Sequence, residues 1–105
     1  MIYSIKNKYL EVSINSSGAS MESLKYLGEE RLWQGGKAWG SRDVVIFPVV
    51  GHAGTYTAEG RQFSPKSHGV ARYSEFMLSE ISESELVLEL SSNAETKRPI
   101  RTISF

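Results

Sequence analysis

The sequence contains no cysteine, and it has only three prolines, two tryptophans and two histidines. Without cysteine the chain has no disulfide framework, no thiolate-bound zinc and no thiol nucleophile. Asp43 is the only aspartate among the 12 acidic residues, which excludes an Asp-rich calcium loop. His52 and His68 are too few for a zinc site without suitably spaced carboxylates, so we expect no metal.

An excess of charge of one sign is also missing. The 105 residues include 12 lysines and arginines against 12 acids, so the formal net charge is zero. A chain without a basic excess lacks the electrostatic term that drives binding to phosphate backbones, and we expect no nucleic-acid partner. Because 40% of the residues are hydrophobic, the composition is that of a folded globular domain.

No long hydrophobic run is present. The longest, residues 44–50, has about a third of the ~20 residues that a membrane helix needs. The first residues do not form a basic stretch followed by an apolar one, which is the pattern of a secretion signal. We therefore expect no membrane contact and a cytoplasmic location.

The dominant pattern in the sequence is an alternation of apolar and polar residues with a period of two. Leu10, Val12 and Ile14 alternate with polar residues, which predicts a strand with one buried face over residues 10–15. Many short strands without an amphipathic helix predict an all-β fold, a sandwich or a barrel-like architecture. Further strands are predicted over residues 20–27, 43–50, 74–81, 86–90 and 100–105, with a hairpin over residues 56–63 that turns at Glu59 and Gly60.

Two of these segments are ambiguous. Residues 43–50 are almost continuously apolar, which predicts a strand covered on both faces, although Pro48 implies an edge, a bulge or a strand end. Residues 83–90 are rich in glutamate and leucine, so a short helix is an alternative there to the strand that the alternation favours.

Glycine and tryptophan mark residues 32–40, which follow a predicted turn at residues 28–31. So much glycine disfavours regular structure, and we expect an ordered loop pinned by Trp33 and Trp39. Together with Tyr56, these rings could stack on the apolar face of a sugar, although packing in the core is the commoner role of an aromatic side chain.

His68 and Arg72 form a polar pair inside an apolar neighbourhood. Histidine exchanges a proton near neutral pH, and arginine offers planar donors to a hydroxyl or phosphate oxygen. The residues alone leave open a surface loop in which His68 only caps a hydrogen bond. They likewise leave Arg42 as either a ligand contact or a charge at a strand end. A Ser-His-Asp triad around Asp43 is formally possible, but the chain has no nucleophile-elbow sequence.

Several short motifs follow one another in an order typical of one known group of proteins. They are Leu-Glu-Val-Ser-Ile (10–14), Gly-Ala (18–19), Leu-Trp-Gln-Gly (32–35), Phe-Pro-Val-Val-Gly (47–51), His-Gly-Val-Ala-Arg (68–72) and Ser-Asn-Ala-Glu-Thr (92–96). This series closely resembles the aldose 1-epimerase, or galactose mutarotase-like, superfamily, and in particular its bacterial branch with a His-Gly-Phe-Ala-Arg signature. The resemblance covers the whole chain but only about the first third of a usual family member. It implies an antiparallel β-sandwich, of which residues 1–105 form the N-terminal portion.

The resemblance also implies a reaction. Members of the family interconvert the α and β anomers of a hexose: a base removes the C1 hydroxyl proton while an acid protonates the ring oxygen, with no metal or cofactor. His68 matches the first of two active-site histidines, which holds the sugar's oxygens, and it is the expected catalytic residue. Arg72 belongs to the same signature, and Arg42 lies roughly where hexose-phosphate relatives have a substrate arginine. A hexose or hexose phosphate is therefore the expected small-molecule partner.

The chain departs from the family pattern in three respects. Val70 replaces the usual phenylalanine of the signature, and His52 stands where an arginine is expected, so we take His52 as a further substrate-binding candidate. The family's second histidine and its glutamate base have no counterpart in these residues, so we expect an isomerase-like chain that is inactive alone. Two other hypotheses are a non-catalytic carbohydrate-binding module and a fragment that self-associates through unpaired strand edges.

Overall fold

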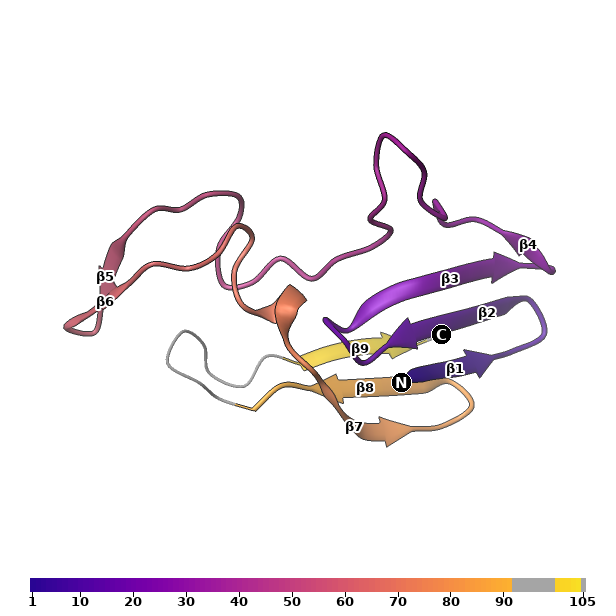
Figure 1. Cartoon of the computed structure of the whole chain (residues 1–105). Helices are drawn as coiled ribbons and strands as arrows, with labels where there is room; N and C mark the ends of the chain where they lie inside the picture. The colour runs from indigo at the N-terminus through magenta and orange to yellow at the C-terminus, as the bar shows by residue number, and fades with distance from the viewer. Residues whose placement is uncertain (92–99, 105) are drawn as a thin grey trace.

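The computed structural model describes residues 1–91 and 100–104, and these residues form three antiparallel sheets (Figure 1). A single 3-10 turn interrupts the β-structure, and no α-helix occurs in the described residues. None of the helical structure in this part of the chain could therefore cross a membrane.

The first sheet has the strand order β1-β2-β3-β4, with neighbours joined along the chain. Its strands are β1 (Ile2–Lys6), β2 (Leu10–Asn15), β3 (Ser20–Tyr26) and β4 (Glu29–Glu30). Val12 and Ile14 of β2 are 2% and 0% exposed, so the alternation in the sequence does mark the buried face. The strands predicted over residues 10–15 and 20–27 are confirmed, whereas β1 was not predicted.

The turn that closes this sheet is shorter than the predicted one over residues 28–31. Leu27 and Gly28 both have positive φ, at 50° and 83°, and these two residues make the turn. Glu29 and Glu30 then pair with Tyr26 and Lys25 as β4. The prediction was wrong in its extent because the exposed glutamates give no periodic signal in so short a strand.

The second sheet of the sandwich has the order β7-β8-β9. It consists of β7 (Met77–Ile81), β8 (Glu85–Glu89) and β9 (Ile100–Ser104). Leu86 and Leu88 are each 1% exposed, while their neighbours in β8 are less buried, which is the pattern of a strand. The helical alternative for residues 83–90 is therefore wrong, and the strands predicted over 74–81, 86–90 and 100–105 are confirmed within the described residues.

The two sheets face each other and enclose one hydrophobic core. In Figure 1, β1 and β8 lie beside each other, and β7 lies on the other side of β8 at the lower edge of the molecule. The buried apolar residues come from both layers: Ile5, Val12, Ile14, Ala19, Ala71, Phe76, Leu86, Leu88 and Leu90. The predicted all-β, antiparallel sandwich is confirmed.

A separate hairpin projects from these layers. Strands β5 (Tyr56–Ala58) and β6 (Arg61–Phe63) pair with each other alone. Glu59 and Gly60 have φ of 51° and 74°, as a two-residue hairpin turn with two positive φ angles requires, so this prediction is confirmed. The Tyr56 and Phe63 rings stack across the two strands, with centroids 5.5 Å apart.

The strand predicted over residues 43–50 is wrong, because these residues have no regular structure. The main-chain groups of Phe47 bond to another loop instead of a neighbouring strand: its N–H donates to the carbonyl of His68 (3.1 Å), and its carbonyl accepts from the Ala71 N–H (3.2 Å). The segment is also not covered on both faces, since Ile46 and Val50 are 41% and 78% exposed. The Phe47–Pro48 peptide bond is cis.

The glycine-rich segment over residues 32–40 is a loop, as predicted. Trp33 pins it, because its indole Nε1–H donates to the carbonyl of Trp39 at 3.0 Å. Neither ring packs in the core, however: Trp33 is 57% exposed and Trp39 is 64% exposed.

Candidate functional site

Two of the loops that carry the sequence motifs interlock, residues 47–51 and residues 66–72. Gly69 lies at their point of closest approach, with φ of +81°. A Cβ atom on Gly69 would lie 2.6 Å from the Pro48 nitrogen and closer still to the Phe47 carbonyl. Only glycine fits there, since the position requires both a positive φ and the absence of a side chain.

His68 is fixed against the first of these loops by two hydrogen bonds to one residue. Its main-chain N–H donates to the carbonyl of Gly51 at 2.9 Å, and its ring Nδ1 accepts from the N–H of Gly51 at 2.9 Å. The side chain is half-buried, and φ of His68 is +66°, in the left-handed region that histidine occupies more readily than most residues. Backbone and ring are thus positioned together.

Arg72 lies in the 3-10 turn η1 (Ala71–Tyr73), directly after the His68 loop. Its guanidinium lies 5.3 Å from the centroid of the Tyr73 ring, and Tyr73 in turn donates its hydroxyl to the Ser67 carbonyl at 3.2 Å. The turn packs against the β2–β3 connection, where a Cβ on Gly18 would lie 2.7 Å from the Arg72 carbonyl. Arg72 is therefore held by its backbone, with its charged group on an aromatic ring.

His52 follows Gly51 in the chain, so the structure brings it to the loop that holds His68. Its side chain is exposed. The four predicted site residues thus divide into two groups. His68 and Arg72 lie on the interlocked loops and His52 directly follows one of them, whereas Arg42 lies elsewhere.

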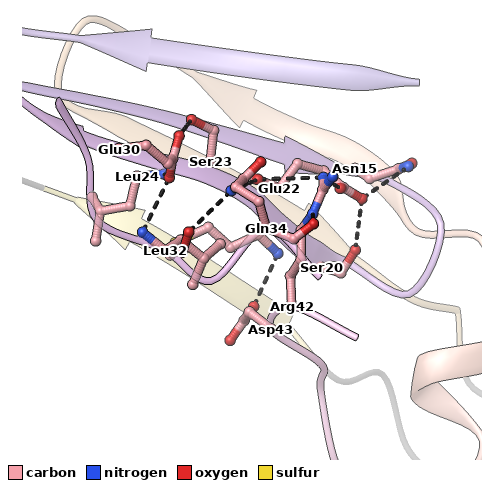
Figure 2. A network of polar contacts seen from close by, with 11 residues as sticks. Asn15, Ser20, Glu22, Ser23, Leu24, Glu30, Leu32, Gln34, Arg42 and Asp43 are labelled. Carbon is pink, nitrogen blue, oxygen red and sulfur yellow. Dashed lines mark hydrogen bonds and ion pairs between the residues drawn. The ribbon is translucent and has the colours of Figure 1, made fainter. Parts of the chain in front are cut away.

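Arg42 belongs to a polar group beside β3 (Figure 2). Its guanidinium forms an ion pair with the Glu22 carboxylate, and its Nε–H donates to the Gln34 carbonyl at 3.3 Å. Arg42 and Glu22 line an open cleft of about 310 Å³ together with Ser20 and Asp43. The guanidinium is therefore already paired with a carboxylate, and a ligand anion at this position would have to displace Glu22.

Asp43 has a structural position in the same region. One of its carboxylate oxygens accepts from the Met21 N–H at 2.9 Å and from Arg101 Nη1 at 2.6 Å. The same Arg101 nitrogen donates to the Ala19 carbonyl at 3.0 Å. Asp43 thus joins β3 to β9, and its contacts are those of a sheet-to-sheet tie instead of a catalytic triad.

Sequence reasoning missed Glu22 and Gly51, the partners of Arg42 and His68. Glu22 sits in a strand among other polar residues, and nothing in its spacing links it to Arg42. Gly51 ends the Phe-Pro-Val-Val-Gly motif, and a glycine after an apolar run is a signal for a close backbone approach. The motif at residues 92–96 lies outside the described residues.

No family model matches the sequence. Protein LacX of Lactococcus lactis subsp. lactis, in its chromosomal and plasmid forms, is 31% identical over 104 residues, which cover 90% of this chain and 35% of LacX. The structure of a galactose mutarotase related enzyme from Lactobacillus acidophilus matches with a TM-score of 0.79 at 32% identity, over 90% of this chain and 33% of that one. A galactose mutarotase-like protein from Lactobacillus casei matches with a TM-score of 0.80 at 27% identity, over 90% of this chain and 34% of that one.

The chain is therefore similar to galactose mutarotase-like proteins in sequence and in fold. It spans about a third of the length of these relatives and corresponds to the N-terminal part of the galactose mutarotase-like sandwich. The resemblance inferred from the order of the motifs is confirmed. The functional roles of the four predicted site residues stay predictions, because the structural matches support the fold and do not test individual side chains. These residues are His68, Arg72, His52 and Arg42.

Proposed function

We propose that this chain carries part of the hexose site of an aldose 1-epimerase-like isomerase. The observation that supports this most is the interlocking of residues 47–51 with residues 66–72. These segments carry two of the motifs in the ordered series, and their contact holds a histidine ring in a defined orientation.

Each residue has a separate part in this proposal. His68 contacts the oxygens of the sugar near the reacting carbon, and Arg72 and His52 bind hydroxyl or phosphate oxygens on either side. Arg42 makes a substrate contact only if the ligand displaces Glu22, so it belongs to the binding of a phosphorylated hexose. A neutral hexose then depends on His68 and Arg72, and a hexose phosphate depends on Arg42 as well.

The reaction itself needs two proton transfers at once. A base takes the proton from the C1 hydroxyl, an acid gives one to the ring oxygen, the C1–O5 bond breaks, and the open chain rotates and closes on the other face. The resemblance matches neither the base glutamate nor the second histidine to these 105 residues. We therefore propose that the chain binds hexose by itself without catalysing the interconversion, which is also what a carbohydrate-binding module would do.

Binding and turnover are measured separately to test this. In an ¹⁵N-labelled sample, millimolar galactose or glucose should shift the amide signals of Gly51 and His68 in a saturable way. The variant His68→Asn keeps a residue that tolerates positive φ, so it should remain folded and lose the response. Lys37→Ala, in the glycine-rich loop, is the matched surface control. An unchanged spectrum in the presence of hexose contradicts the site.

Polarimetry on freshly dissolved α-glucose or α-galactose tests the second half of the proposal. The rate with the purified chain should equal that of buffer at every protein concentration. Acceleration above buffer that disappears in His68→Asn would show that these residues suffice for the reaction, and the inactivity would be refuted.

We propose self-association as a second property, because one side of the sandwich is open. Leu78 and Ile81 of β7 pair with Leu88 and Leu86, so they face the inner layer, yet they are 36% and 46% exposed. Within the described residues β7 is also an edge strand of its sheet, so apolar surface and main-chain groups without a strand partner coincide there. We propose that a second copy of this chain covers this surface at β7.

Sedimentation at increasing concentration tests the association. Dimers or larger species should form in the wild type, and Leu78→Lys should shift the chain to monomer. Thr57→Lys, on the projecting hairpin, is the charge-matched control and should leave the association unchanged. A monomer at the highest concentration reached contradicts the proposal.

A further inference from the structure

Gly51 and His68 form a closed pair of hydrogen bonds. The His68 N–H donates to the Gly51 carbonyl, and the Gly51 N–H donates to Nδ1 of the His68 ring, both at 2.9 Å. One residue thus holds both the backbone and the side chain of the histidine. Rotation of the ring would break the second bond and leave a main-chain N–H without a partner in a half-buried loop.

The direction of the second bond determines where the ring carries its proton. A main-chain N–H can only donate, so Nδ1 must accept with its lone pair and cannot carry a hydrogen. A neutral imidazole has one N–H, and it is therefore on Nε2. Among the described residues, no group forms a hydrogen bond with Nε2, so that N–H is available to a ligand.

We propose that Gly51 is a positioning residue that holds neutral His68 in the Nε2–H form, so that the ring presents a hydrogen-bond donor to the site. The identity of the acceptor, a hexose oxygen, rests on the proposed function, whereas the form of the ring does not. A donor at this place stabilises an oxygen on which negative charge develops. The same assignment excludes neutral His68 as the base for the C1 hydroxyl, because its one free lone pair is occupied by the Gly51 N–H.

The chain contains its own reference for a measurement. His52 is exposed and is the only other histidine, so its ring, when neutral, should exchange between both neutral forms. Long-range ¹H–¹⁵N spectra of ¹⁵N-histidine-labelled protein distinguish a ring nitrogen that carries hydrogen from one that does not. His68→Asn assigns the two sets of signals.

The expected spectrum has separate Nδ1 and Nε2 signals for His68, typical of a single Nε2–H form, and averaged signals for His52. A coupling across the hydrogen bond should also connect the Gly51 amide nitrogen with Nδ1 of His68, and none should be seen for His52. Averaged His68 signals, or an Nδ1–H form, would overturn the assignment.

Two variants of Gly51 separate positioning from folding. Gly51→Ala is strained by the positive φ of 65°, but its Cβ meets no atom within 4 Å and its N–H is kept. In the folded fraction of this variant, both the Nε2–H form and the coupling should remain. Replacing Gly51 with glycolic acid in a semisynthetic chain turns its N–H into an ester oxygen without restricting φ, which is +65° here and which proline could not adopt. In the folded fraction of that chain, His68 should average as His52 does. Failure of hexose to bind while wild-type His68 stays in the Nε2–H form would refute the proposed function and leave this inference standing.

Discussion

Position 69 accepts only glycine, and a second glycine in the chain offers a close comparison for it. Gly69 and Gly28 have nearly the same φ, 81° and 83°, but a Cβ on Gly28 meets nothing within 4 Å. Gly28→Ala therefore measures the cost of positive φ alone, about 1 kcal/mol. Gly69→Ala adds a collision with the main chain of Phe47 and Pro48 and should cost at least about 2 kcal/mol more.

Urea denaturation followed by tryptophan fluorescence gives both values. If Gly69→Ala is no more destabilising than Gly28→Ala, the two loops do not interlock as described. Hexose-dependent shifts in the two variants add a functional readout, since only Gly69→Ala displaces His68.

The Glu30 carboxylate makes the stability of the folded chain depend on pH. The Ser23 hydroxyl, together with the N–H groups of Leu24 and Leu32, donates to its carboxylate and lowers the pKa of Glu30 below its ordinary value of 4.5. The unfolded chain then binds this proton more tightly than the folded chain. The stabilisation is therefore complete above pH 4.5 and is lost as the pH falls through the lower, folded-state pKa.

Glu30→Gln should flatten this acid-side loss of stability, because the variant has no carboxylate to protonate there. Thermal unfolding between neutral and acidic pH measures it in wild type and variant. Glu83→Gln removes an exposed carboxylate from the β7–β8 turn and controls for the loss of one negative charge. An equal loss of stability on acidification in wild type and Glu30→Gln would contradict the role of this hydrogen-bonded group.

Among the secondary-structure elements, strands could be predicted from the sequence where one face is buried and the other is exposed to solvent. Val12 and Ile14 show this alternation in β2, and Leu86 and Leu88 show it in β8. Residues 43–50 could not be predicted in the same way, because a continuous apolar run carries no periodicity. Its conformation depends on hydrogen bonds to His68 and Ala71, which are remote in the sequence and leave no local pattern.

The ion pair between Asp43 and Arg101 is a partly buried charged contact that ties β3 to β9. Their side chains are 30% and 19% exposed, and the nitrogen–oxygen distance is 2.6 Å. Asp43→Asn keeps an acceptor for the Met21 N–H but removes the charge, so it leaves a partly buried guanidinium without its counter-ion. We expect a loss of about 1–3 kcal/mol in unfolding free energy.

A double-mutant cycle with Arg101→Gln isolates the interaction. The two single variants should each destabilise the chain, and the double variant should cost less than their sum, since the second change removes a charge already unpaired. Additive costs would show that the two side chains stabilise the sheets independently. The same cycle on Lys6 and Glu11, an exposed pair at 3.6 Å, should show little coupling.

For the molecule as a whole, the fold and the family resemblance could be predicted from the sequence, but the contacts within the site could not. A period of two over many short strands is enough to predict an antiparallel sandwich, and the order of the motifs is enough to predict the resemblance to galactose mutarotase-like proteins. The pairing of Arg42 with Glu22 and of His68 with Gly51 depends on how loops cross in space. Such contacts join residues 17 to 20 positions apart, with no repeating pattern between them.

Two leucines that pair with each other across β7 and β8 differ sharply in exposure, and this difference leads to a prediction about the open side of the sandwich. Leu88 is 1% exposed between the sheets, while Leu78, its partner on β7, is 36% exposed. In dilute solution, Leu88→Ala should cost about 2–5 kcal/mol of unfolding free energy and Leu78→Ala less than about 1 kcal/mol. If copies of the chain cover β7, the cost of Leu78→Ala should rise with protein concentration while that of Leu88→Ala stays constant. Urea denaturation at two concentrations a hundredfold apart measures this difference, and a constant, small cost for Leu78→Ala would mean that this side remains uncovered.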